Sequence, residues 1–226
     1  MDVKKVFFMS KKIKVAPSLL AADFSNLEKE LKKIEKSKAD ALHLDIMDGH
    51  FVPNFSMGPK IVGTVNKLSD IFLDVHLMIY NPYDYVEKFI EQGADMITFH
   101  VEATEDIEDT LNYIKKCSKK VGLALNPKTS FSLVERYLEL IDVLLIMSVN
   151  PGFGGQKFIE STLKKIDLAK KIKDENKLKY EIQVDGGIDD IIGKKCVQKG
   201  ADFLVAGTYL FSQSDMQKGV EKLKSL

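Results

Sequence analysis

The chain has 226 residues, of which 33 are Lys or Arg and 33 are Asp or Glu, so its formal net charge at pH 7 is zero. This balance argues against a nucleic-acid-binding protein, because phosphate recognition usually shows as a basic excess or a basic stripe. Hydrophobic residues at 45% and charged residues at 29% are typical of a globular chain and disfavour disordered and fibrous classes.

Three features of the sequence indicate the cellular compartment of the protein. No apolar run reaches the ~18 residues that a membrane helix needs. The first dozen residues, MDVKKVFFMSKK, lack the long apolar segment and the cleavage site of a secretory signal. Cys117 and Cys196 are too few for a disulfide framework and have no CxxC spacing. We therefore expect a cytoplasmic protein that binds neither membranes nor nucleic acids.

From Lys14 onward, short β-rich runs alternate with amphipathic stretches, as in the βα units of a parallel sheet. The predicted strands cover residues 15–20, 41–46, 71–79, 95–101, 121–126, 143–149, 181–187 and 203–207. A helix-like segment follows each strand, and the predicted helix N-caps are Asp23, Ser25, Asn81, Ser130 and Asp189. The lysine-rich stretch 171–180 is expected to be a solvated helix end.

Eight units of roughly 28 residues suit an α/β fold of one closed (β/α)8 TIM barrel, near the lower end of its size range. The expected domain covers residues 1–226, with a short N-terminal extension at 1–13. A doubly wound open sheet is the main alternative, but no GxGxxG turn follows the first strand.

Several ionisable residues lie inside strands that should be almost wholly apolar, since parallel strands are buried on both faces. The set that falls near the carboxyl ends of strands, where barrel enzymes place their sites, is His43, Asp45, His76 and Asp185. Two imidazoles and two carboxylates suit one divalent ion per chain, such as Zn²⁺, Fe²⁺, Mn²⁺ or Co²⁺. His100 and Asp74 are predicted to orient these ligands, although a buried His taken singly is more often a hydrogen-bonded core residue.

Glycine-rich segments follow the last three predicted strands: SVNPGFGGQKF (148–158), VDGGI (184–188) and VAGTYLF (205–211). Glycine lets backbone N–H groups approach an anion, and phosphate often binds to the last loops of such barrels. A tight turn is the alternative reading of Gly152, Gly154 and Gly155. Three such loops at one mouth favour an anion site.

Taken together, these motifs resemble those of the ribulose-phosphate 3-epimerase family. The segments that carry the resemblance are HLDIMDGHFVPN (43–54), VHLMI (75–79), SVNPGFGGQ (148–156) and VDGGI (184–188). The similarity runs from about Lys14 to Phe211. The main departure is AGTYLF in place of the more usual AGSAIF, which puts Thr208 at a phosphate-binding position and a bulky Tyr209 beside it.

The resemblance implies a metal-dependent enzyme that interconverts D-ribulose 5-phosphate and D-xylulose 5-phosphate through a cis-enediolate. It implies that Asp45 and Asp185 are the paired acid and base as well as metal ligands. The implied substrate-binding residues are Ser18, Met47, His76, Met78, Met147, Gly152, Phe153, Gly154, Gly155, Asp185, Gly186, Gly187, Gly207 and Thr208. Methionine in a barrel also commonly fills the core. The family usually forms homo-oligomers.

Three other functions account for part of the pattern. A sibling epimerase acting on D-allulose 6-phosphate would use the same ligands. A phosphate-binding lyase or tryptophan-pathway synthase predicts a Lys near the carboxyl end of a strand, whereas Lys128 and Lys157 fall in predicted loops. A non-catalytic barrel predicts the loss of a ligand or a glycine loop, and all are present.

Overall fold

A computed structural model describes residues 13–226, so the expected extension lies almost entirely outside the described residues. The strands are β1 (Lys14–Pro17), β2 (Leu42–Met47), β3 (Leu73–Met78), β4 (Met96–His100), β5 (Lys120–Leu125), β6 (Val143–Met147), β7 (Glu181–Asp185) and β8 (Phe203–Ala206). All pair in parallel in the order β1-β8-β7-β6-β5-β4-β3-β2. A parallel bridge between Ser18 and His43 joins the two end strands, which makes the sheet a TIM barrel as predicted.

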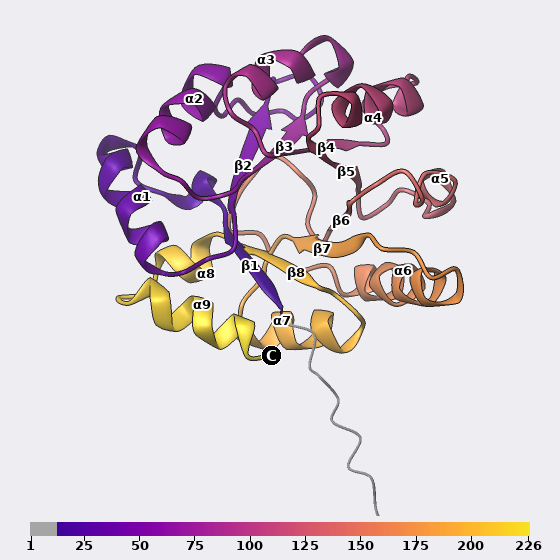
Figure 1. Cartoon of the computed structure of the whole chain (residues 1–226). Coiled ribbons are helices and arrows are strands. Elements are labelled where there is room, and N and C mark those ends of the chain that lie inside the picture. The colour runs from indigo at the N-terminus through magenta and orange to yellow at the C-terminus, as the bar shows by residue number, and fades with distance from the viewer. Residues whose placement is uncertain (1–12) are drawn as a thin grey trace, which may run out of the picture.

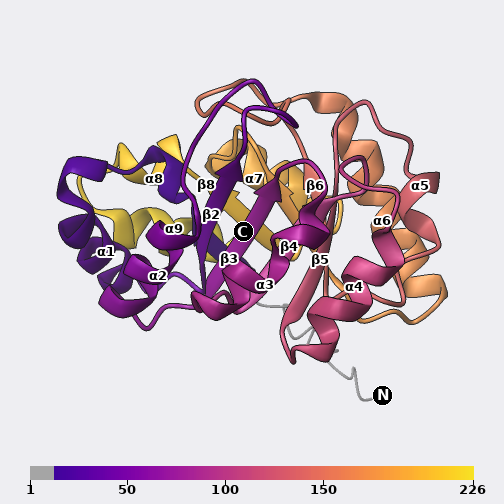
Figure 2. The same cartoon turned by 90° about the horizontal axis from the view of Figure 1, so that it is seen from above.

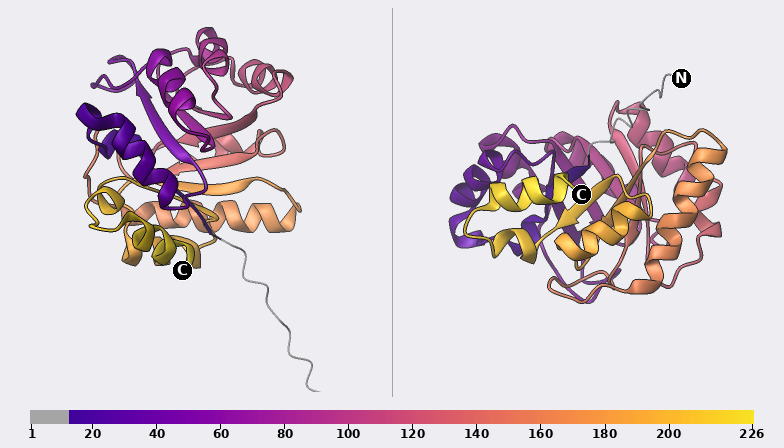
Figure 3. Two further views of the ribbon diagram at one scale, coloured as in Figure 1. Left: turned by 60° about the vertical axis from the view of Figure 1, so that its left-hand side comes forward. Right: turned by 90° about the horizontal axis from the view of Figure 1, so that it is seen from below.

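Helices surround the strands (Figure 1). They are α1 (Leu27–Lys36), α2 (Pro59–Leu68), α3 (Val86–Glu91), α4 (Ile107–Lys116), α5 (Ser132–Glu135), α6 (Leu163–Glu175), α7 (Asp190–Gln198), α8 (Thr208–Phe211) and α9 (Met216–Lys224). Short 3-10 turns cover Leu19–Ala21, Phe24–Asn26, Pro82–Asp84 and Glu160–Thr162. Helix α9 lies beside α1, which completes the helical ring (Figure 3). Among residues 13–226, none of the helices has the length and apolar character needed to span a bilayer.

The main core lies between the barrel and its helices. Leu44 and Ile46 of β2 and Leu31 and Ile34 of α1 belong to one buried cluster. The alternate residues of each strand point into the barrel, because strand side chains alternate between faces. Gln183 of β7 and Asp74 of β3 are hydrogen-bonded although their strands are not neighbours, so both side chains must lie inside the barrel. The barrel interior therefore contains a polar layer below its mouth.

Loops at the carboxyl ends of the strands form that mouth. The loop after β2 and the loop after β6 lie together (Figure 2), and the Asn54 side chain donates a hydrogen bond to the Gly152 carbonyl at 2.7 Å. Ser56 accepts a hydrogen bond from the amide of Met47 at 3.0 Å, so the β2 loop folds back onto its own strand. The functional loops are thus fixed to the barrel.

Three local predictions need correction. The first strand ends at Pro17 instead of residue 20, because a 3-10 turn follows. Asp23 and Asp189 do cap helical turns, but Ser25, Asn81 and Ser130 make no side-chain cap. The stretch 171–180 is partly buried: Lys173 is 8% exposed and pairs with Asp202, and Tyr180 is 1% exposed.

Candidate active site

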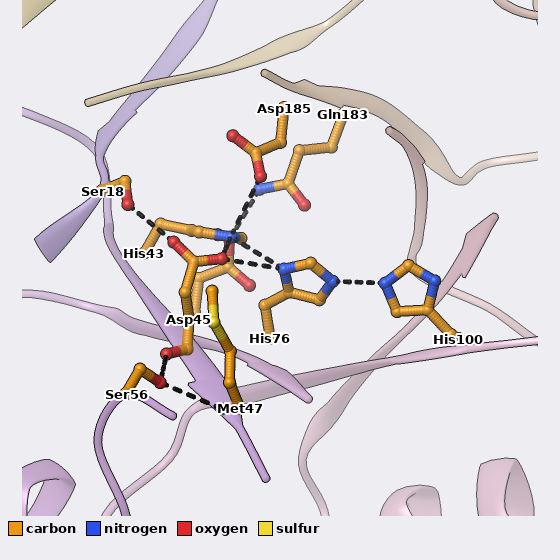
Figure 4. Close-up of polar contacts among 10 residues, drawn as sticks. Ser18, His43, Asp45, Met47, Ser56, His76, His100, Gln183 and Asp185 are labelled. Carbon is orange, nitrogen blue, oxygen red and sulfur yellow. Dashed lines mark hydrogen bonds and ion pairs between the residues drawn. The ribbon is translucent and has the colours of Figure 1, made fainter. Parts of the chain in front are cut away.

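Four predicted ligands meet at the barrel mouth, and we call His43, Asp45, His76 and Asp185 the ligand cluster (Figure 4). One nitrogen or carboxylate oxygen from each lies within 4.8 Å of all the others. Asp45 Oδ1 is 3.3 Å from His43 Nε2 and 3.1 Å from His76 Nδ1, and Asp185 Oδ2 is 4.0 Å from His43 Nε2. The cluster is nearly buried, since both imidazoles are inaccessible to solvent.

The other nitrogen of His43 has a carboxylate partner. His43 Nδ1 is 2.8 Å from Asp74 Oδ2, and the Gln183 amide donates to the same oxygen at 2.6 Å. A carboxylate only accepts hydrogen bonds, so Nδ1 carries the proton of a neutral His43. Its Nε2, which lies 3.3 Å from Asp45 Oδ1, would then present a lone pair to a metal ion that displaces the second proton of His43.

His76 also has an outer partner. Its Nε2 is 2.9 Å from His100 Nε2, and His100 Nδ1 is 3.1 Å from Glu102 Oε2. Asp74 and His100 thus both lie directly behind the ligand cluster, where the sequence predicted them.

The pKa shifts within the ligand cluster indicate that a positive charge near its carboxyl groups would be stabilising. Burial and the neighbouring Asp45 raise the pKa of Asp185 to about 7. Burial opposes ionisation of Asp45, but His43 and His76 outweigh it and hold the pKa of Asp45 far below its usual range. Burial lowers the pKa of His43, yet Asp74 and Asp45 overcome this and raise it well above its ordinary value. Burial also lowers the pKa of His76, to about 4.

These residues fit a divalent ion. Two nitrogens and two carboxylate oxygens converge from three strands, and a cation among them would offset the repulsion between Asp45 and Asp185. Mixed nitrogen and oxygen donors suit Zn²⁺ and its neighbours in the first transition row better than Ca²⁺ or Mg²⁺. The ligand cluster could therefore hold one such ion.

A cavity of about 800 Å³ opens beside the ligand cluster. The predicted substrate-binding residues on its wall are Ser18, Met47, Met78, Met147, Gly152, Phe153, Gly154, Gly155, Asp185, Gly186, Gly187, Gly207 and Thr208. Asp45 also lines it, and the Ser18 hydroxyl donates to Asp45 Oδ2 at 2.7 Å. His76 lies behind this wall, as part of the ligand cluster. The structure thus places the predicted metal ligands and the predicted glycine loops around one cavity.

The glycine segment after β7 is shaped by close backbone contacts. Gly187 has φ +66°, and a Cβ there would lie 2.8 Å from the backbone nitrogen of Phe158. Gly186 has φ +118°, and a Cβ there would meet Val149. The Ser148 hydroxyl donates to the carbonyl of Gly186 at 2.7 Å and fixes this turn. Only glycine fits both positions without a shift.

Sequence reasoning missed four residues that support the site: Gln183, Glu102, Ser148 and Ser56. A signal existed for Gln183 alone. Gln183 lies two residues before Asp185 on one strand, so the strand period that linked His43 to Asp45 applied to it, whereas Glu102 lies in the turn after β4. Ser148 and Ser56 act on backbone groups that only the folded loops bring near.

Comparisons with known proteins agree with this geometry. A sequence model of the ribulose-phosphate 3 epimerase family matches residues 14–211. The chain is 46% identical over 204 residues to a ribulose-phosphate 3-epimerase of Chlamydia pneumoniae, covering 89% of each chain. It is 45% identical over 213 residues to one of Bacillus subtilis, covering 94% of this chain and 98% of the relative.

Among solved structures, 3-hexulose-6-phosphate synthase from Salmonella typhimurium superposes with a TM-score of 0.71 at 16% identity, covering 94% of this chain and 97% of the other. A tryptophan synthase α-subunit from Pyrococcus furiosus gives 0.70 at 15% identity, covering 96% and 99%. At these identities the likeness establishes the shared barrel alone.

Proposed function

Since this chain belongs to the ribulose-phosphate 3-epimerase family and is an epimerase, we propose that it interconverts D-ribulose 5-phosphate and D-xylulose 5-phosphate by proton transfer at carbon 3. The observation that carries this proposal is the ligand cluster opening onto a cavity walled by three glycine loops. The carboxylates of the ligand cluster suit proton transfer at a carbon next to a carbonyl, and the glycine loops suit the binding of a phosphate.

Two carboxylates perform the proton transfer. Asp45 on β2 and Asp185 on β7 enter the cavity from different sides of the barrel mouth. One, as the carboxylate, takes the carbon 3 proton, the electron pair of the broken C–H bond enters the bond between carbons 2 and 3, and the π pair of the carbon 2 carbonyl moves onto its oxygen, giving a planar enediolate. The other carboxyl group, which begins as the protonated acid, gives its proton to the opposite face, which inverts the carbon without turning the substrate over.

The ligand cluster holds one divalent ion, with zinc the best match to its donors. When bound, this ion supplies positive charge that stabilises the developing enediolate by several kcal/mol. His43 and His76 would contribute neutral donors, so the negative charge that offsets a divalent ion comes from the aspartates.

The glycine loops bind the phosphate and orient the sugar. Backbone N–H groups near Gly155, Gly187 and Gly207, together with Thr208, surround one end of the cavity. Met47, Met78 and Met147 line the other end beside the carboxylates and give it an apolar wall. Holding the phosphate at a fixed distance places carbon 3 between the two carboxylates.

We also infer a cytoplasmic homo-oligomer. The inference draws on the free cysteines Cys117 and Cys196 and on exposed aromatic residues at the mouth, where Phe55 is 76% and Tyr80 is 58% exposed. Light scattering during gel filtration tests the oligomer, and a monomeric mass would contradict it.

The proposed reaction is tested with purified protein. Metal content is measured, and D-xylulose 5-phosphate formation from D-ribulose 5-phosphate is followed before chelation, after chelation and after zinc is restored. We expect stoichiometric metal, loss of turnover on chelation, and recovery. D-allulose 6-phosphate is assayed in parallel, and faster turnover of it would replace the pentose assignment. Full activity in a metal-free sample would refute the metal dependence.

A further inference from the structure

A series of hydrogen-bonded polar groups runs from His76 through His100 to Glu102, in the turn after β4. The His76 and His100 rings are inaccessible to solvent, and their Nε2 atoms are 2.9 Å apart. The ring of Phe51 packs on that of His100, with centroids 4.8 Å apart. The only carboxylate that faces the outer nitrogen of His100 within residues 13–226 is that of Glu102, at 3.1 Å. The proposed mechanism does not use this series of hydrogen-bonded groups.

Glu102 is held by the loop that follows β5. Its Oε1 accepts hydrogen bonds from the Asn126 amide, at 2.7 Å, and from the Thr129 hydroxyl. Burial acts to raise the pKa of Glu102, but hydrogen bonds from His100, Thr129 and Asn126 outweigh it and bring the pKa to about 2. Glu102 is therefore a carboxylate at neutral pH, and both of its oxygens only accept.

Lys165 fixes the same loop from α6. Its ammonium group donates to the carbonyls of Asn126 and Thr129 at 2.8 Å and 2.5 Å, and its charge interacts with Glu102. The carboxylate thus has a fixed position and a nearby counter-charge.

The proton positions follow from these partners. Because Glu102 only accepts, Nδ1 of a neutral His100 carries its proton, and His100 Nε2 presents a lone pair. That lone pair faces His76 Nε2, so in the metal-loaded protein Nε2 is the protonated nitrogen of His76. His76 Nδ1 then presents its lone pair towards Asp45 Oδ1, 3.1 Å away, an arrangement that a cation between the two atoms would stabilise.

We propose that Glu102, acting through His100, is a positioning residue that fixes the tautomer of His76 and keeps His76 Nδ1 available to a metal ion. The proposal rests on the metal-dependent function above and extends it to residues that do not touch the ligand cluster. His43 reaches its orienting carboxylate, Asp74, directly. His76 needs an intervening imidazole because its carboxylate, Glu102, lies in the turn after the neighbouring strand β4 and contacts His100 instead.

Glu102→Gln tests the proposal because it replaces one oxygen by an NH₂ group. The remaining oxygen is best placed between the two donors on the loop side, Asn126 and Thr129. The NH₂ group would then face His100 Nδ1 and force His100 to move its proton to Nε2. His76 would in turn carry its proton on Nδ1, where the ion would bind. Glu105→Gln is the matched control, since it removes the same charge from an exposed position in the same loop.

We expect zinc affinity, measured by chelator competition, to fall about 10- to 100-fold in Glu102→Gln and to stay at the wild-type value in Glu105→Gln. Equal affinity in the two variants overturns the proposal. Long-range ¹H–¹⁵N correlation of the zinc-loaded wild-type protein gives an answer that needs no variant to fold. Protons on His100 Nδ1 and His76 Nε2 are expected, and an unprotonated nitrogen at either position overturns the proposal.

The two hypotheses fail differently. Wild-type protein that binds zinc but does not epimerise the sugar overturns the proposed reaction, while the affinities and tautomers still decide the role of Glu102. Wild-type protein that binds no divalent ion overturns both.

Discussion

Three glycines on the cavity wall form a graded series that tests the phosphate site. A Cβ at Gly154 would meet no atom within 4 Å, and its φ is not positive. Gly155 has φ +72°, and a Cβ there would meet only Thr208 Oγ1, at 3.9 Å. Gly187 has φ +66°, and a Cβ there would lie 2.8 Å and 3.0 Å from backbone atoms of Phe158 and Gln156. Alanine therefore adds no strain at Gly154, backbone strain at Gly155, and both backbone strain and a steric clash at Gly187.

The strain at each position sets the expected loss of stability and the expected rise in KM. An alanine in the left-handed region costs about 1–2 kcal/mol, so Gly155→Ala should lower the free energy of unfolding by that amount. Gly187→Ala should lower it further, because two backbone segments must move apart. The same shift displaces backbone donors of the phosphate site, so KM for D-ribulose 5-phosphate should rise at least about tenfold, equivalent to ~1.4 kcal/mol of binding. Gly154→Ala should leave both quantities near the wild-type values.

Urea unfolding and steady-state kinetics measure the two quantities, with inhibition by inorganic phosphate as a direct probe of the anion site. The phosphate inhibition constant should rise in parallel with KM. Equal KM values for Gly154→Ala and Gly187→Ala, with both proteins folded, would refute the placement of the phosphate.

The remaining predictions concern the metal, the thiols and acid stability. His76→Ala should lose most of the bound ion, as measured by metal analysis, and a stoichiometric ion in that variant would remove His76 from the ligand set. A thiol reagent should label Cys117 in the folded protein but not Cys196, since burial raises the pKa of Cys196 to about 12; equal labelling rates would contradict this. The Glu102 carboxylate has a pKa near 2 when folded against an ordinary value of 4.5, so it stabilises the fold above pH 4.5 and this contribution is lost as the pH falls towards 2. The difference in unfolding free energy between wild type and Glu102→Gln should therefore shrink over that interval, and a constant difference would argue against the assigned pKa.

The barrel was predictable because its signals are local. Each strand is a short apolar run, and the period of two placed His43 with Asp45 and Asp74 with His76 before any coordinates. Ligands at strand ends then had to meet at one mouth, since parallel strands of a barrel share a carboxyl edge.

What the sequence could not show depends on contacts between distant segments. The first strand ends at Pro17 because the chain turns there towards the barrel mouth, although the apolar pattern continues through Leu20. Lys173 looked like a surface lysine until the fold placed Asp202 against it at 2.6 Å. Glu102 looked like a loop carboxylate, and its role depends on an imidazole from β4 and a loop after β5.

The central claim is that Asp45 and Asp185 each handle the proton on one face of carbon 3. Asp45→Asn and Asp185→Asn should both stop epimerisation, yet each keeps one carboxylate that can remove and return a proton on its own face. Both residues are also proposed ligands, so metal content is measured and only metal-loaded samples are compared.

In deuterated water, each metal-loaded variant should exchange the carbon 3 proton of one epimer only, and the two variants should prefer opposite epimers. Proton magnetic resonance of D-ribulose 5-phosphate and D-xylulose 5-phosphate follows the exchange directly. Exchange of both epimers at similar rates by either variant would contradict the two-carboxylate mechanism and require a single base that serves both faces.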